Sequence, residues 1–90
     1  MISNSQKEEL RHAAREVLAT RPGTALDIRG IRRRIEQGKL LDFGFDDVDL
    51  RAALAVLAGK DQITIVHDGL GSTEHFIATA EGILAFERGH

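Results

Sequence analysis

The N-terminal fifth of the chain alternates apolar and polar residues with the period of a helix. Apolar residues three or four positions apart predict a helix over residues 6–20. Ser5 is a suitable N-cap, and Glu8 three residues later would complete a capping box. Pro22 and the glycine after it end the helix, because proline cannot continue it. Residues 24–26 are then free to form a short extended segment. The expected buried face consists of Leu10, Ala13, Ala14, Val17 and Leu18.

Two further helices follow, over residues 28–37 and from Asp46 to about Gly59. Asp27 and Asp46 are their expected N-caps, since an aspartate side chain accepts hydrogen bonds from the free amides of a first turn. The loop between the helices is rich in leucine and phenylalanine, so we expect it to pack on the core. The apolar stripes of the two helices consist of Ile28, Ile31 and Ile35, and of Leu50, Ala53, Leu54 and Leu57.

Residues 62–67 and 73–78 alternate with period two and predict an antiparallel hairpin, joined by the glycine-rich turn 68–72. Thr79 would cap a last short helix. The order helix, short strand, helix, helix, strand, strand, helix is that of a winged helix-turn-helix. We therefore expect one α+β domain over residues 1–90, with a three-helix core, a short strand, a hairpin wing and a last helix. The expected inward residues of this C-terminal part are Ile63, Ile65, Phe76 and Ala78, then Ala80, Ile83 and Leu84.

Several segments resemble known families of winged-helix proteins. The architecture resembles ArsR-like regulators. More narrowly, the chain is similar to small winged-helix proteins encoded in Mu-like prophages, through the segments VLATRPG, LDIRGIRRR, DVDLRAALAVLAG, DGLGST and ATAEGILAFERG. The resemblance implies a transcriptional regulator that binds double-stranded DNA, as a dimer. ArsR-type metal sensors use cysteine ligands, and because this chain has no cysteine we expect neither a metal nor another cofactor.

Composition and charge narrow the expected partners. The chain has 90 residues, the size of one domain, and its lack of cysteine suits a reducing cytoplasm. The N-terminal residues contain no apolar run typical of a signal peptide, and no stretch approaches the length of a membrane span. The formal net charge is −2. However, residues 21–41 carry six basic and two acidic side chains, a net +4, whereas residues 42–61 and 62–90 each carry a net −3.

This basic segment predicts contacts with DNA phosphates. In a helix-turn-helix the second helix crosses the DNA backbone, whereas the third reads base edges. If about four phosphates were neutralised, log affinity would fall with log salt concentration with a slope of about −3.6. The alternative is a solvated helix face with local ion pairs, for instance to Glu36. The candidate DNA-binding residues are Arg29, Arg32, Arg33, Arg34, Lys39 and Arg51.

The third helix is unusual for a base-reading element. Its start carries Asp46, Asp47 and Asp49, which would repel phosphates, and only Arg51 on its flank is a plausible reader. A helix that is apolar on nearly all sides is usually buried on both faces. The alternative function is therefore a protein-interaction module, such as a phage assembly or packaging accessory, that contacts another subunit or protein; an exposed face without a role is the third possibility. The candidate interface residues are Val48, Ala52, Ala55 and Val56.

The wing offers a weak metal hypothesis and nothing that indicates catalysis. His67 would lie opposite Glu74 across the strands, with Asp68 and His75 nearby, but a third ligand is not obvious. A polar hairpin is the simpler interpretation. The serines lack the context of a nucleophile elbow, and the DGLGST turn lacks the lysine of a P-loop. We therefore expect no enzymatic activity.

Overall fold

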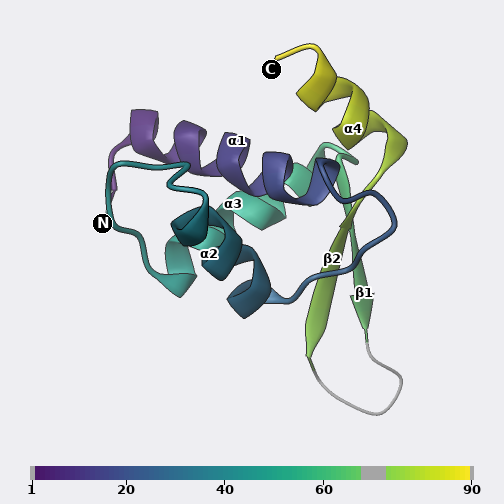
Figure 1. The fold of residues 1–90 in the computed structure, drawn as a ribbon, viewed down its shortest axis with the longest axis horizontal. Coiled ribbons are helices and arrows are strands. Elements are labelled where there is room, and N and C mark those ends of the chain that lie inside the picture. The colour runs from purple at the N-terminus through teal and green to yellow at the C-terminus, as the bar shows by residue number, and fades with distance from the viewer. Residues whose placement is uncertain (1, 68–72, 90) are drawn as a thin grey trace.

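The computed structural model describes residues 2–67 and 73–89. Within them the chain forms four helices and an antiparallel hairpin with the topology of a winged helix (Figure 1). Leu26 forms an isolated antiparallel bridge with Phe76, so the predicted short strand is present beside the hairpin. The fold class and element order predicted from the sequence are therefore confirmed. The elements are α1 (Asn4–Ala19), α2 (Ile28–Gln37), α3 (Asp47–Gly59), β1 (Ile63–His67), β2 (Glu74–Ala78) and α4 (Ala80–Glu87).

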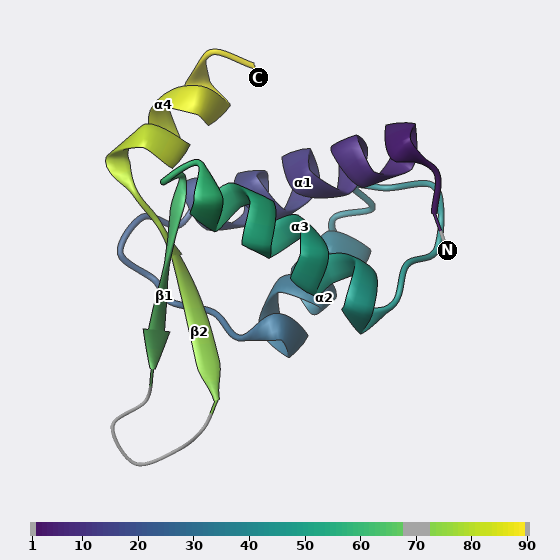
Figure 2. The same cartoon turned by 180° about the vertical axis from the view of Figure 1, so that it is seen from behind.

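The first three helices pack together, and the hairpin projects from one end of this group. Figures 1 and 2 show α2 and α3 on the same side of α1, with α4 against the end of α1 where the hairpin begins. The core lies between the three helices and the root of the hairpin. All the residues predicted to form the buried faces of these helices are buried, and they are joined by Ile63 and Phe76. No helix in the described part of the chain is long and apolar enough to span a membrane.

The starts of α2 and α3 are as predicted, whereas α1 begins earlier. The carboxylate of Asp27 accepts a hydrogen bond from the amide of Gly30 at 2.8 Å, and Asp46 caps α3 through the amide of Asp49, also at 2.8 Å. The prediction that Ser5 caps the first helix is wrong. The cap is Ser3, whose Oγ accepts from the amide of Gln6 at 3.1 Å. The amide of Ser3 donates in return to Gln6 Oε1, and Ile2 packs against the core just before the cap.

The hairpin has the expected antiparallel pairing, but β1 is exposed beyond Ile63. Ile65 lies opposite Phe76, yet Ile65 is 39% exposed while Phe76 is buried, so the prediction that Ile65 points into the core is wrong. The reason is that β2 is flanked by β1 and by the bridge at Leu26, whereas β1 is the edge strand and extends beyond the helices. The predicted turn at 68–72 lies outside the described residues.

The last helix docks through a glycine rather than through its apolar side chains. The prediction that Ala80 and Leu84 are inward is wrong, since both are exposed, and of the three predicted residues Ile83 alone is half-buried. The buried residue of α4 is Gly82, which lies so close to the carbonyl oxygen of Gln62 that a Cβ atom there would collide with it. This close approach orients the helix and turns Leu84 toward solvent.

Candidate nucleic-acid interface

The second helix and the residue after its C-cap present basic side chains that form no ion pair with the described residues. Arg29 and Arg33 are exposed and Arg34 is half-buried in the last turn of α2. Lys39 is exposed just beyond the C-cap of this helix. Among the described residues, no acidic group lies within ion-pair distance, 4.0 Å, of any of these four cations. A cluster of this kind attracts phosphate groups, since its charge is not compensated within the chain.

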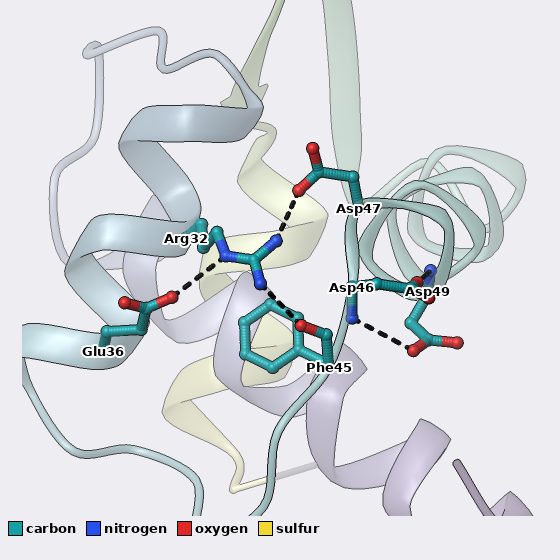
Figure 3. A network of polar contacts seen from close by, with 6 residues as sticks. All are labelled: Arg32, Glu36, Phe45, Asp46, Asp47 and Asp49. Carbon is teal, nitrogen blue, oxygen red and sulfur yellow. Dashed lines mark hydrogen bonds and ion pairs between the residues drawn. The ribbon is translucent and has the colours of Figure 1, made fainter. Parts of the chain in front are cut away.

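Arg32 differs from its neighbours because it is held by other groups of the chain (Figure 3). Its Nε donates to Glu36 Oε1 at 3.0 Å, its Nη1 to Asp47 Oδ1 at 2.5 Å, and its Nη2 to the carbonyl oxygen of Phe45 at 2.7 Å. The guanidinium also lies 5.1 Å from the centre of the Phe45 ring, within the range of a cation–π contact. Hydrogen bonds to Asp47 and Glu36 raise the pKa of Arg32 above its ordinary value. Arg32 therefore joins α2 to the start of α3.

The aspartates at the start of α3 are occupied by structural contacts. Asp46 and Asp49 form a reciprocal capping box, in which the amide of Asp46 donates to Asp49 Oδ2 at 3.2 Å. The hydrogen bond from the amide of Asp49 lowers the pKa of Asp46 below its ordinary value. Asp47 accepts from Arg32, as described above. The local acidity that makes α3 a poor phosphate-binding element is thus required to begin the helix and to join it to α2.

Arg51 and Arg29 come together at the junction of α2, α3 and the hairpin. Both line a groove of about 410 Å³ that ends at Thr73 and Glu74 on the hairpin. Arg51 Nη1 lies 3.6 Å from Glu74 Oε1, a long and exposed ion pair that stabilises the fold little. The fold therefore brings two of the six candidate residues into one groove, although three carboxylates, those of Asp27, Asp47 and Glu74, line it as well.

The outer face of α3 is apolar and open to solvent. Val48 is 73% exposed and Val56 is 40% exposed, while Ala52 and Ala55 between them are also exposed. A small cavity of about 220 Å³ lies beside this face, where α3 meets α1. The four residues predicted to form a protein interface therefore do share an accessible surface, and their contact with a partner stays a prediction.

Arg15 is a feature that the sequence analysis missed. It lies outside the apolar face predicted for the first helix, yet it is only 7% exposed. Its Nη1 donates to Gln62 Oε1 at 3.1 Å and its Nη2 to His12 Nδ1 at 3.1 Å, whereas its buried Nε has no hydrogen-bond partner in the described part of the chain. Burial lowers the pKa of the Arg15 guanidinium. No local signal marks this position, because its burial depends on Gln62, 47 residues away along the chain.

The described strands of the wing have the predicted register. His67 pairs with Glu74 across the strands, as expected. Within residues 2–67 and 73–89, no group of three or more histidine, aspartate or glutamate side chains is arranged to hold a metal ion. Asp68, which the metal hypothesis also considered, lies outside the described residues.

Comparison with known proteins identifies the fold and not the family. No protein-family model matches the chain, and no curated protein sequence matches it either. Among solved structures, the chain is similar to a transcriptional regulator from Clostridium thermocellum, with a TM-score of 0.77 and 16% sequence identity. The similarity covers 99% of this chain and 84% of the other. At this identity the likeness establishes a shared winged-helix architecture, in agreement with the topology described above.

Proposed function

We propose that this protein binds double-stranded DNA as a winged-helix transcriptional regulator, mainly through contacts with backbone phosphates. The observation that carries the proposal is the uncompensated charge of Arg29, Arg33 and Arg34 on the second helix. In helix-turn-helix proteins this helix crosses the DNA backbone. The likeness to a transcriptional regulator supports the same function. The resemblance to winged-helix proteins of Mu-like prophages extends the proposal to a prophage-encoded regulator that acts as a dimer.

The contacts of Arg32 reduce the number of phosphates that we assign to this helix. Because Arg32 already donates to Glu36, Asp47 and Phe45, we assign it to the junction of the helices and not to DNA. Three unpaired arginines then predict a slope of log affinity against log salt of about −2.7, instead of about −3.6 for four phosphates. Lys39 and Arg51 lie at the two ends of this surface and would make the slope steeper if they also reach phosphates.

The apolar face of α3 indicates that base reading contributes little. Side chains that read base edges are hydrogen-bonding groups such as arginine, asparagine and glutamine, and Arg51 alone on this helix has that chemistry in an accessible place. We therefore expect DNA affinity that depends strongly on salt and weakly on sequence.

The test is fluorescence anisotropy with a random DNA duplex at about 50 mM salt, where phosphate contacts are strongest. The wild-type protein should bind, and the double variant Arg29→Glu/Arg33→Glu should lose the binding. A control with the same change of charge, Lys7→Glu/Arg88→Glu, replaces exposed cations on α1 and after α4 and should keep most of it. If the wild-type protein does not bind, or if the two double variants bind equally, the second helix is not a DNA surface.

A second candidate function follows from the exposed face of α3. A valine that is 73% exposed, with a second valine and two alanines on the same face, is typical of a contact surface for protein. We propose as the alternative that this face binds a second subunit or another protein, as in a phage assembly or packaging accessory. Light scattering tests self-association: Val56→Glu should reduce the mass of a wild-type dimer to that of a monomer, whereas Val66→Glu on the hairpin should not.

A further inference from the structure

A cationic cavity lies between α1 and the C-terminal end of α3, apart from the arginines of α2. Its volume is about 440 Å³, within the rough range of 300–1,000 Å³ that is typical of small-molecule sites. Three basic side chains line it, against one carboxylate, that of Glu8. In a chain whose net charge is −2, this is a concave surface of opposite sign. The lining residues are Glu8, Arg11, His12, Arg15, Leu57, Lys60, Gln62 and Gly89.

The guanidinium of Arg15 is the most informative group in this cavity. A guanidinium has five N–H donors, and here Nη1 and Nη2 each use one of them, on Gln62 and His12. Neither acceptor is a carboxylate, since one is the amide oxygen of Gln62 and the other a ring nitrogen of His12. Burying a charge without a counter-ion is costly, and buried arginines are normally paired with a carboxylate or a phosphate. Arg15 therefore has an unmet requirement for an anion.

Two other cations surround the same cavity without a counter-ion. Arg11 lies one turn before Arg15 on α1, and Lys60 is the C-cap residue of α3. Among the described residues, no carboxylate lies within 4.0 Å of either side chain. Lys60 is exposed and Arg11 is half-buried, so both can turn toward a ligand. Three converging cations can surround a group with two or three oxygens.

The other side of Arg15 is unsuitable for an anion. A second cavity of about 500 Å³ shares Arg15 and Glu8 with the first, but Glu9 and Glu16 line it as well. Like charges disfavour the entry of an anion there. The distribution of charge around Arg15 therefore selects the side that contains Arg11 and Lys60.

We propose that the cavity between α1 and the end of α3 binds a small phosphate- or carboxylate-bearing molecule, with its charged group against Arg15, Arg11 and Lys60. The ligand would connect α1 to Gln62, which precedes β1 and whose carbonyl oxygen accepts a hydrogen bond from the amide of Thr79 at 3.1 Å. Binding would therefore stabilise the position of the hairpin root and α4 relative to α1. The proposal does not depend on whether the protein binds DNA.

The experiment is a titration of the ¹⁵N-labelled protein with inorganic phosphate and, separately, with acetate, followed by NMR. Ionic strength is held constant with chloride at neutral pH, so that general screening does not change. We expect saturable shifts concentrated at the amides of the residues that line the cavity. The variants Lys60→Gln and Arg11→Gln should each raise the dissociation constant by roughly tenfold, the effect of losing one charge-assisted hydrogen bond. Arg21→Gln, the same change on an exposed arginine beyond α1, should leave it unchanged.

The two anions separate the possible sources of the ligand. Saturation with phosphate alone assigns the site to phosphate-bearing molecules, with acetate alone to carboxylates, and with both to small anions in general. The proposal is overturned if neither anion saturates, or if both cavity variants bind like the Arg21→Gln control. Each replaced side chain lies outside the buried core, so the spectrum of each variant verifies that it is folded before the titration begins.

Discussion

Two arginines join helices in this protein, and their surroundings are opposite. Arg32 joins α2 to α3 with two carboxylates, a carbonyl oxygen and an aromatic ring around it. Arg15 joins α1 to Gln62 through the amide oxygen of Gln62 and a ring nitrogen of His12, and its Nε has no hydrogen-bond partner among the described residues. The half-buried Arg32 has its charge compensated by two carboxylates, whereas no carboxylate of the described residues lies within 4.0 Å of the buried Arg15.

The partners around each arginine indicate whether its contact is structural or is suited to binding a ligand. Around Arg32 the chain supplies every partner, so the α2–α3 junction is complete without any other molecule. Around Arg15 the described residues supply hydrogen bonds but no carboxylate within 4.0 Å, so this junction can gain stability from an added anion. The first arrangement is expected of a structural element and the second of a binding site.

The largest effect on the free energy of unfolding is expected where α4 contacts Gln62, the residue that also accepts a hydrogen bond from Arg15. Replacing Gly82 with alanine would push a methyl group into the carbonyl oxygen of Gln62. Backbone on both sides must then separate, and we expect a loss of about 3 kcal/mol in the free energy of unfolding. Urea denaturation measures it. In Gly59→Ala no atom lies within 4 Å of the added methyl, so this control should remain near the wild-type value. Equal stability of the two variants would contradict the close contact.

The second prediction concerns the contribution of Arg32 to the free energy of unfolding. Replacing Arg32 with methionine keeps an unbranched stem but removes the guanidinium and its hydrogen bonds to Glu36, Asp47 and the carbonyl oxygen of Phe45. We expect the free energy of unfolding to fall by about 1–2 kcal/mol. The matched variant Arg33→Met, on the next residue, should change it by less than about 0.5 kcal/mol, since Arg33 is exposed and unpaired. Similar losses in both would show that the Arg32 contacts do not stabilise the fold.

The third prediction compares the loss of the Arg15 side chain with that of Arg32. Arg15→Met removes two hydrogen bonds, but it also removes an uncompensated buried charge and a buried donor without a partner. These effects oppose each other, so we expect the free energy of unfolding, measured in urea, to stay within about 1 kcal/mol of the wild type. A loss of more than about 2 kcal/mol would mean that the buried charge is stabilised without any ligand.

The smallest effect concerns the carboxylate that caps α3 next to Arg32. The pKa of Asp46 is lowered from about 3.8, mainly by the amide of Asp49, so its ionised form stabilises the folded state. That contribution is complete above the unfolded pKa and is lost as the pH falls through the lower folded pKa. Asp46→Asn keeps a capping side chain without the charge. Thermal unfolding at several pH values should show a small advantage of the wild type near neutrality that disappears in acid. If the difference in stability between the wild type and Asp46→Asn does not change with pH, the charge of Asp46 is not its cause.

The helices were predictable where their signals are local. Asp27 and Asp46 cap the starts of α2 and α3, and Gly38 and Gly59 mark their ends. The start of α1 was missed by two residues because Ser3 and Ser5 both have a capping partner three residues later. Ile2, which packs on the core, favours the earlier cap, and this contact is not visible in the local pattern.

The roles of single residues in the candidate site were less predictable. The arginine cluster on α2 is a property of composition and helical spacing, and its exposed position follows from the isoleucine stripe. The sequence could not separate Arg32 from Arg33, because the difference depends on Asp47 and Phe45 arriving from the next helix and its loop. In the same way, the exposure of Ile65 depends on how far the hairpin extends beyond the helices.

The sequence by itself determined the winged-helix order of elements, the buried faces of three helices and the cluster of positive charge on the second. Each of these depends on residues a few positions apart, whose spacing is set by helix and strand geometry. The tertiary structure alone decided that Arg32 is satisfied within the chain, that Arg15 is buried with no carboxylate of the described residues beside it, and that α4 docks through Gly82. Those outcomes depend on groups brought together from distant segments, because burial and charge compensation are properties of the packed surroundings and not of the residue.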